Sequence, residues 1–226
     1  MEAYEGLIQT IALTMGVAWA SGINLYGTLV ALGVMMNMGY VDLPPDLKVV
    51  GDPLVIAAAG FMYIVEFFAD KIPGVDTGWD TLHTLVRIPA GALLAAGAIG
   101  EVGAGAEIAA ALVGGTIAAG THFTKAGTRV LINTSPEPFS NWTASITEDI
   151  AVFAGLWAAL QHPVLFLVLL FIFILLMIWL LPKLFRAIKK VFRFFIDFFS
   201  GKKEPEPEVN FESAIDSVDP PTPTKE

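Results

Sequence analysis

The chain has 226 residues, of which 55% are hydrophobic and 15% are charged, and its formal net charge is −9. Soluble domains carry about 25% charged residues, so this composition excludes an ordinary soluble domain and indicates an integral membrane protein. The absence of cysteine from the sequence excludes disulfides and thiolate metal sites.

Six apolar segments, taken in chain order, predict membrane-spanning helices. Their approximate limits are 6–38, 53–70, 78–99, 106–132, 147–161 and 163–181. The clearest apolar run covers residues 151–181, and Pro163 within it marks the join between the last two helices. The prediction is an all-α membrane protein with about six transmembrane helices over residues 1–181.

The first predicted span is too long for one crossing. Thirty-odd helical residues extend for roughly 50 Å, whereas the hydrocarbon core of a bilayer is about 30 Å thick. Gly22 and Asn24, in the stretch GVAWASGINLYGTLV, therefore predict a break in this helix. The stretch GGTIAAGTHFTKAGT has the same small-residue pattern and predicts a second break at Gly120.

The two small-residue stretches also suggest an internal repeat. A displacement of about 100 residues aligns Gly22 with Gly120 and Asn24 with His122. We therefore expect two three-helix repeats, 6–99 and 106–181, with the second inverted in the membrane because three crossings are an odd number. The alternative is coincidence, since small residues are common in membrane helices.

Charged side chains gather at the end of the second predicted span and the start of the third. Two carboxylates four residues apart share a helix face, and three polar residues at i, i+3 and i+7 share a face of the next helix. In chain order the residues of this group are Glu66, Asp70, Lys71, Asp76, Asp80, His83 and Arg87. We interpret His83 as a hydrogen-bonding contact between packed helices rather than as a proton relay.

A second charged group lies in the other half of the chain. His122, Lys125 and Arg129 are also spaced i, i+3, i+7, in the stretch AGTHFTKAGTR. Glu148 and Asp149 follow in SITED, where the pattern predicts a capping box at the start of the fifth helix.

Ionisable groups at bilayer depth cost about 3 kcal/mol or more each, so they face the bundle interior and pair with one another. We expect both charged groups to form one polar cluster in the cytoplasmic half, with Glu66, Asp70 and Asp80 as the leading partners of Lys125 and Arg129. Two interpretations stay open: an ion-pair network that holds helices together, or a polar pathway for a substrate.

The C-terminal region differs from the rest. Residues 182–200 alternate basic and aromatic side chains at helical spacing, which predicts an interfacial amphipathic helix whose segment 183–199 binds anionic lipid. A cytoplasmic extension of the last span is compatible with the same pattern. Residues 201–226 are acidic and proline-rich, which predicts a disordered tail. The basic residues after the last span predict a cytoplasmic C-terminus.

The stretch EFFADKIPGVDTGWDTLHTLVRIPAGALLA resembles the signature of the bacterial membrane proteins grouped as domain of unknown function 4126. The second half resembles the same family through His122, Lys125 and Arg129, the run NTSP, and the pair Glu148 and Asp149. The resemblance covers most of residues 6–181 and departs from the family pattern at Ile88, which separates Arg87 from Pro89. It implies a multi-pass protein of the bacterial inner membrane and no particular activity.

Two functions fit the sequence. The first is a small secondary transporter or channel for an anionic solute or lipid phosphate, attracted by the cations, with the carboxylates coupling protons. The alternative is a non-transporting membrane scaffold or lipid-binding subunit. We expect no enzyme, cofactor or metal site, because the sequence has no nucleophile elbow, phosphate loop or histidine motif for a metal. The expected partner is the lipid bilayer and no nucleic acid; a homo-oligomer stays open.

Overall fold

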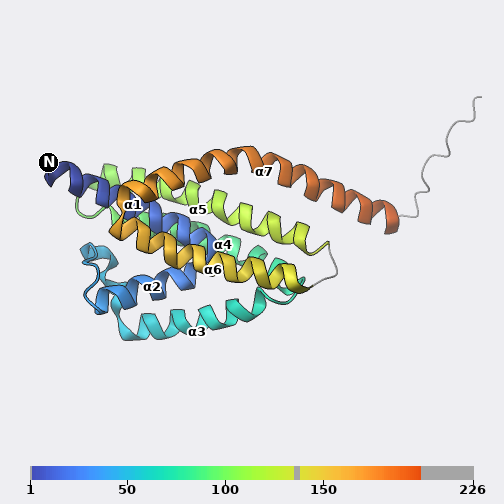
Figure 1. The fold of residues 1–226 in the computed structure, drawn as a ribbon, viewed down its shortest axis with the longest axis horizontal. Helices are drawn as coiled ribbons and strands as arrows, with labels where there is room; N and C mark the ends of the chain where they lie inside the picture. Colours follow the sequence, from blue (N-terminus) through green and yellow to red (C-terminus); the bar gives the residue numbers. More distant parts are fainter. Residues whose placement is uncertain (1, 135–137, 200–226) are drawn as a thin grey trace, which may run out of the picture. The chain divides into compact units, whose positions relative to one another are not determined.

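The computed structural model describes residues 2–134 and 138–199 and consists of helices joined by short connections (Figure 1). The helices are α1 (Glu2–Ile23), α2 (Leu25–Asn37), the 3₁₀ helix η1 (Pro45–Gly51), α3 (Pro53–Ala69), α4 (Val75–Ala98), α5 (Ala104–Ile132), α6 (Pro138–Gln161) and α7 (Pro163–Phe199). The described part of the chain contains no β-strand, which confirms the all-α prediction.

The chain divides into two compact units, residues 1–188 and residues 189–226. The second unit is described only for the end of α7, where Phe192 and Ile196 are exposed. The tail predicted to be disordered, 201–226, lies outside the described residues. The predicted interfacial segment 183–199 forms the last part of α7 rather than a separate helix.

Four of the described helices, α1, α5, α6 and α7, are long and apolar enough to cross a membrane. A fifth crossing results if η1 and α3, which meet at 65°, form one broken span. These apolar helices support a multi-pass membrane protein, but they do not confirm the six predicted spans. The first predicted span is divided, and α2 is too short for a full crossing.

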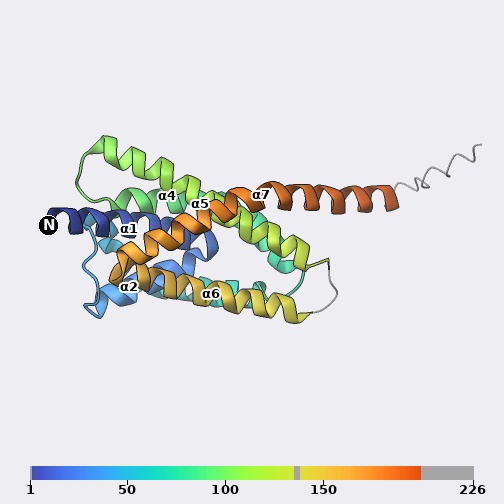
Figure 2. The same ribbon diagram turned by 45° about the horizontal axis from the view of Figure 1, so that its top comes forward.

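Helix α1 occupies the middle of the first unit. It contacts α4, α5 and α6, while α2 packs against α3, η1 and α6 (Figures 1 and 2). Its side chains Val17 and Ala20 join a buried apolar cluster with residues of α2, α4 and α6. Trp19 of α1 packs against the same cluster and meets Phe166 of α7 edge to face at 6.0 Å between ring centroids. Burial of this central helix sets the positions of the helices around it.

Small residues let α1, α4 and α5 approach closely. A Cβ atom built on Gly22 would lie 2.5 Å from the backbone oxygen of Ala118, and one built on Gly91 would overlap the Ala118 side chain. A Cβ on Gly114 would overlap Ala95. Close backbone approach through small residues is a common way for membrane helices to associate.

The first predicted break is present, because α1 ends at Ile23 and α2 begins at Leu25. The backbone of Asn24 is extended, and its side-chain oxygen accepts a hydrogen bond of 2.8 Å from the Gly27 amide, as an N-cap does. Gly22 lies in the last turn of α1. The join at Pro163 is also present, between α6 and α7.

The second predicted break, at Gly120, is wrong. Helix α5 runs without interruption from Ala104 to Ile132, and Gly120 lies inside it. A Cβ atom there would lie 2.5 Å from the sulfur of Met177 in α7, so this glycine permits helix packing rather than a break. The two repeats are therefore not confirmed, since the two halves differ at the feature that suggested them.

The predicted capping box at Ser145 and Glu148 is also wrong. Helix α6 begins at Pro138, seven residues earlier, so both side chains lie in the helix interior. Proline is well suited to the first turn of a helix, because its missing amide proton has no partner there. Ser145 instead contacts the ammonium group of Lys71 at 3.2 Å.

Candidate functional site: a buried charge network

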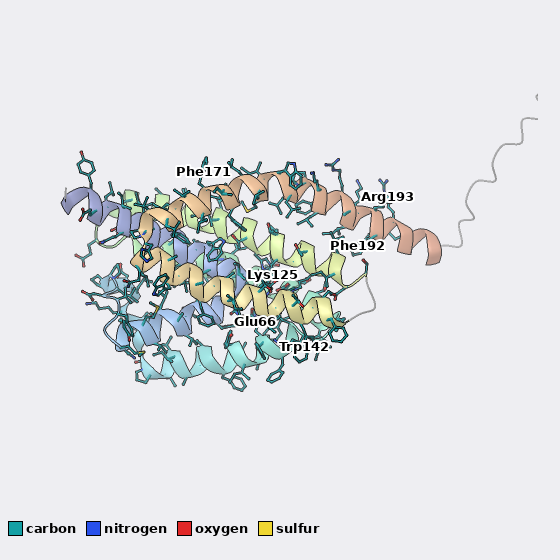
Figure 3. The ribbon with its side chains drawn as sticks, in the orientation of Figure 1. Glu66, Lys125, Trp142, Phe171, Phe192 and Arg193 are labelled. Atoms are coloured by element: carbon teal, nitrogen blue, oxygen red, sulfur yellow. The ribbon has the colours of Figure 1, made fainter. Side chains whose placement is uncertain are left out.

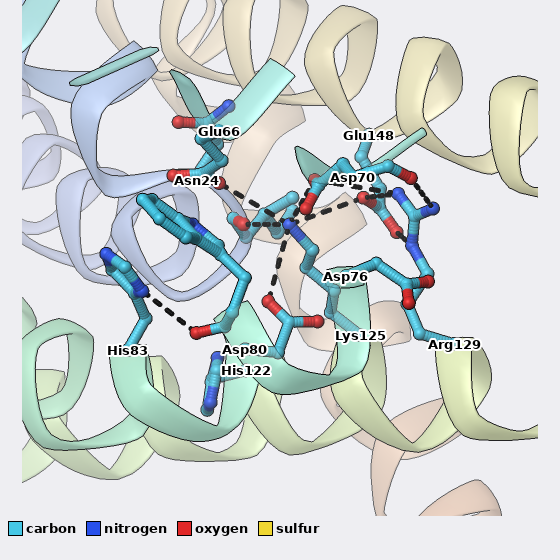
Figure 4. Close-up of polar contacts among 12 residues, drawn as sticks. Asn24, Glu66, Asp70, Asp76, Asp80, His83, His122, Lys125, Arg129 and Glu148 are labelled. Carbon is cyan, nitrogen blue, oxygen red and sulfur yellow. Dashed lines mark hydrogen bonds and ion pairs between the residues drawn. The ribbon is translucent and has the colours of Figure 1, made fainter. Parts of the chain in front are cut away.

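Seven ionisable side chains from four segments of the chain meet inside the first unit, and we call them the charge network (Figure 4). Its members are the acids Glu66, Asp70, Asp80 and Glu148 and the bases Arg87, Lys125 and Arg129. Figure 3 shows Glu66 and Lys125 among the helices, whereas Phe171 of α7 lies on an outer face. The structure thus brings together both charged groups of the sequence.

Arg87 bridges two helices. Its guanidinium donates to Glu66 Oε1 of α3 at 2.6 Å and to Asp80 Oδ1, two turns earlier in α4, at 2.8 Å. All three side chains are at most 1% exposed. Such fully desolvated pairs need good geometry to offset the cost of desolvation, and the short distances here provide it.

Lys125 of α5 lies at the centre of the network. Five oxygen atoms lie within 3.7 Å of its ammonium nitrogen, and the side chain is 3% exposed. They are Asp70 Oδ2 at 2.8 Å, Ile23 O at 3.2 Å, Glu66 Oε1 at 3.5 Å, Glu148 Oε2 at 3.6 Å and Asp80 Oδ1 at 3.7 Å. The single ammonium group of Lys125 therefore contacts all four acids of the network.

Arg129, one turn further along α5, is held by α6. Its guanidinium donates to both carboxylate oxygens of Glu148, at 3.2 Å and 2.6 Å, in the two-pronged geometry that favours arginine. The remaining nitrogen donates to the backbone oxygens of Asp70 at 2.9 Å and Asn141 at 3.1 Å. Glu148 thus binds a cation and does not act as the expected helix cap.

The break between α1 and α2 lies beside this network and hydrogen-bonds to it. The Ile23 carbonyl, at the end of α1, accepts a hydrogen bond from Lys125. The side-chain Nδ2 of Asn24 donates to Asp149 Oδ1 of α6 at 3.0 Å. A helix end freed from regular bonding therefore supplies polar groups at the point where the charges converge.

The two buried histidines are held in fixed orientations. Arg87 is a donor only, so His122 accepts from it through Nδ1 at 3.3 Å and donates through Nε2 to Thr84 Oγ1 at 2.8 Å. His83 donates from Nδ1 to the Trp79 carbonyl, and its Nε2 accepts from Tyr26 of α2 at 3.1 Å. His83 therefore makes the helix-packing contact that its sequence context suggested.

Asp76 and Lys71 lie beside the network in contacts of their own. Asp76 accepts from the amides of Gly74 and Thr77 and from the side chain of Asn133 at 2.7 Å. Lys71 lies over the Phe67 ring, 3.0 Å from its centroid. Burial lowers the pKa of Lys71, and the negative charge of nearby carboxylates acts in the opposite direction.

Sequence reasoning missed several residues that support these groups. They are the carbonyl of Ile23 and the side chains of Thr84 and Asn141, whereas Asn133 and Ser145 entered the sequence analysis only through the NTSP run and the capping-box pattern. Asn141 donates to Asn133, which in turn donates to Asp76. Their short uncharged side chains gave no signal beyond a polar residue in an apolar helix, and the Ile23 carbonyl gave none.

Three carboxylate oxygens in the network are buried without a hydrogen-bond partner: Glu66 Oε2, Asp70 Oδ1 and Asp80 Oδ2. The four acids also exceed the three bases by one formal charge. Among the described residues, no group of three or more histidine, cysteine or acidic side chains is arranged to hold a metal ion. Two of the larger surface cavities, of about 770 and 720 Å³, are lined by residues outside the network. Six of its seven side chains are at most 5% exposed, and Glu148, at 19%, is the member that reaches the protein surface.

No curated protein and no solved structure matches the chain. The family described as Domain of unknown function (DUF4126) matches residues 11–183, which include every member of the charge network and the break at Asn24. This match covers most of the chain, and the chain belongs to the DUF4126 family.

Proposed function

We propose that the protein is a small secondary transporter of the bacterial inner membrane, with the charge network as its site for an anionic solute or lipid phosphate. The break at Asn24 carries the proposal. In many transporters, discontinuous helices place free backbone groups at the site for substrate and coupling ion. Here the Ile23 carbonyl at such a break contacts Lys125, which also contacts three buried carboxylates and the partly exposed Glu148.

The ion pairs suggest how solute and coupling ion are linked. Lys125 and Arg129 are bound by carboxylates in the closed state, so an anion reaches them only when Asp70 and Glu148 release them. The released carboxylates then need a proton or another cation, because an unpaired charge at bilayer depth is costly. Anion and cation binding therefore favour each other, which is the thermodynamic basis of symport.

We expect purified protein in liposomes to take up an anionic solute together with cations. The assay uses inorganic phosphate, glycerol phosphate and small carboxylates, each with a trapped pH dye and a radiolabel. Lys125→Met is expected to abolish uptake, since the central cation is lost. Lys48→Met is the matched control, because Lys48 is half exposed and pairs with exposed Asp42. Uptake by Lys125→Met at the rate of Lys48→Met would contradict the proposal.

A non-transporting scaffold is the second candidate, and the pairing of every base in the network with a carboxylate favours it. Under this alternative the charges matter only as pairs. Exchanging Lys125 and Asp70 (Lys125→Asp with Asp70→Lys) then gives a folded protein that also complements a deletion strain. Under the transporter proposal the exchange restores folding at most, because the cation moves to another helix.

The C-terminus is expected to be cytoplasmic. Five basic residues, Lys183, Arg186, Lys189, Lys190 and Arg193, follow the apolar part of α7, and positive charge near a span favours the cytoplasmic side. A green fluorescent protein fused after Glu226 should be fluorescent and an alkaline phosphatase fused there inactive, since each reporter works on one side only. The reverse pattern would overturn this orientation.

Residues 183–199 are expected to bind anionic lipid. Phe185, Phe192 and Ile196 are exposed along the same helix as the five basic residues, and each base near an anionic surface contributes about 1 kcal/mol. A synthetic peptide of this segment should bind vesicles of mixed phosphatidylglycerol and phosphatidylcholine far more tightly than pure phosphatidylcholine, in co-sedimentation. A peptide with the five bases replaced by glutamine serves as the control. Equal binding to both vesicle types would remove the electrostatic part of the proposal.

A further inference from the structure

The surroundings of Lys125 Nζ resemble the coordination shell of an ion. Five oxygens, four from carboxylates and one from the end of a broken helix, lie 2.8–3.7 Å from a single nitrogen. An ammonium group has only three protons to donate, so it cannot hydrogen-bond all five oxygens. The arrangement thus provides more oxygen ligands than a lysine side chain uses.

We propose that the oxygens around Lys125 Nζ form a binding site for a monovalent cation, which the Lys125 ammonium occupies in this structure as a cation carried by the chain itself. The inference rests on the proposed function, because it identifies the coupling ion: when Lys125 moves onto an anionic solute, a free monovalent cation takes its place among the carboxylates.

The distances indicate the size of the ion. Calcium binds oxygen at about 2.3–2.6 Å and magnesium at about 2.0–2.1 Å, well short of the contacts that surround Lys125. A singly charged ion the size of ammonium fits this wider shell without moving the four helix segments that supply the oxygens.

The carboxylates around Lys125 have acceptor atoms to spare, and one donor of the network, Arg87 Nε, is also buried without a hydrogen-bond partner. Glu66, Asp70 and Asp80 each contact Lys125 through one oxygen, while the second oxygen is buried and has no hydrogen-bond partner. All three side chains are more than nine-tenths buried. With Lys125 gone, the acids would outnumber the bases four to two, and burying unpaired charge is strongly unfavourable. A free cation at the vacated point relieves this imbalance.

The test measures the thermal stability of the purified full-length Lys125→Ala protein in detergent. Ammonium, methylammonium, sodium and potassium chloride are titrated at constant ionic strength against choline chloride, whose cation is too large for the site. We expect at least one small cation to raise the melting temperature by several degrees in a saturable way, since ligands that bind only the folded state stabilise it. Choline should have no such effect.

Two further variants make the result specific. Lys48→Ala, which removes a surface ion pair, should respond equally to all the salts. Lys125→Ala with Asp70→Asn removes the carboxylate that lies nearest to the ammonium, and should lose most of the response. A response of Lys125→Ala that is the same in choline as in the small cations overturns the proposal. So does a Lys125→Ala protein that folds in none of the salts, whereas folding only with a small cation supports it.

The transport assay is read separately. A saturable cation response without solute uptake keeps the cation site and removes the transporter proposal. Solute uptake driven by protons alone, with no cation response in Lys125→Ala, keeps the transporter and removes the cation site.

Discussion

Arg87→Met is expected to lower the free energy of unfolding by about 3–5 kcal/mol, the usual cost of removing one partner of a buried ion pair. The Arg87 side chain is fully buried, and it is the shortest contact of Glu66 and of Asp80. Methionine has a similar length but no charge, so both carboxylates would keep their burial and lose their main partner. Lys125 lies 3.5 Å or more from each and only partly compensates.

The measurement is the melting temperature in detergent, followed by circular dichroism or a size-exclusion readout of soluble protein. Arg186→Met is the matched control: Arg186 lies on the exposed side of α7 and contacts the Pro182 carbonyl within its own helix. Adding Glu66→Gln to Arg87→Met should recover part of the lost stability, because it removes one unpaired charge. A loss for Arg87→Met as small as that for Arg186→Met would show that the network does not stabilise the fold.

The faces of the charged residues could be predicted from spacing alone. Asp80 and Arg87 lie two turns apart, and so do His122 and Arg129, so each pair had to share one side of its helix. Because an unpaired charge at bilayer depth is costly, the charged faces of the two helices are then expected to meet. The pairing itself was expected, but the sequence could not reveal which carboxylate each cation takes, because that depends on how the helices cross. Glu66 and Asp80 pair most closely with Arg87, and Arg129 pairs with Glu148.

The two small-residue stretches show where pattern reasoning fails. Asn24 and His122 occupy corresponding positions, yet only the chain at Asn24 leaves the helix. The Asn24 amide can bond the Gly27 backbone and Asp149 at once, which compensates for the helical bond lost at the break. The His122 ring instead finds Thr84 and Arg87 on α4 without any change in the backbone. Tertiary partners, absent from any sequence pattern, decide which stretch breaks.

The number of spans could not be predicted for a similar reason. The rule of about 20 apolar residues per crossing assumes that each apolar stretch is one straight helix. Here the first stretch divides at Asn24, and η1 and α3 meet at a sharp bend. Asp80 and Arg87 face partners inside the bundle, but they lower the mean hydropathy of α4. Helix α4 is therefore not among the helices apolar enough to count as a crossing.

Gly22→Ala is expected to destabilise the protein by about 1–3 kcal/mol, the usual cost of overpacking a well-packed interior. The new Cβ atom would lie 2.5 Å from the Ala118 backbone oxygen and 2.9 Å from the Thr121 Cβ. A backbone oxygen cannot rotate away as a side chain can, so α1 and α5 must separate. Gly78→Ala is the control, because Gly78 is exposed in α4 with no atom within 4 Å of the new Cβ, and alanine favours helix there by about 0.5–1 kcal/mol.

The same substitution should also disturb the charge network, which links packing to the site. Gly22 precedes Ile23, whose carbonyl binds Lys125, and Thr121 lies one turn before Lys125 on α5. Moving α1 away from α5 lengthens the contact between Ile23 O and Lys125 Nζ. Gly22→Ala should therefore reduce solute uptake by more than its loss of folded protein explains, measured as uptake per folded molecule. Uptake per folded molecule equal to that of Gly78→Ala would show that the close contact of α1 and α5 serves stability alone.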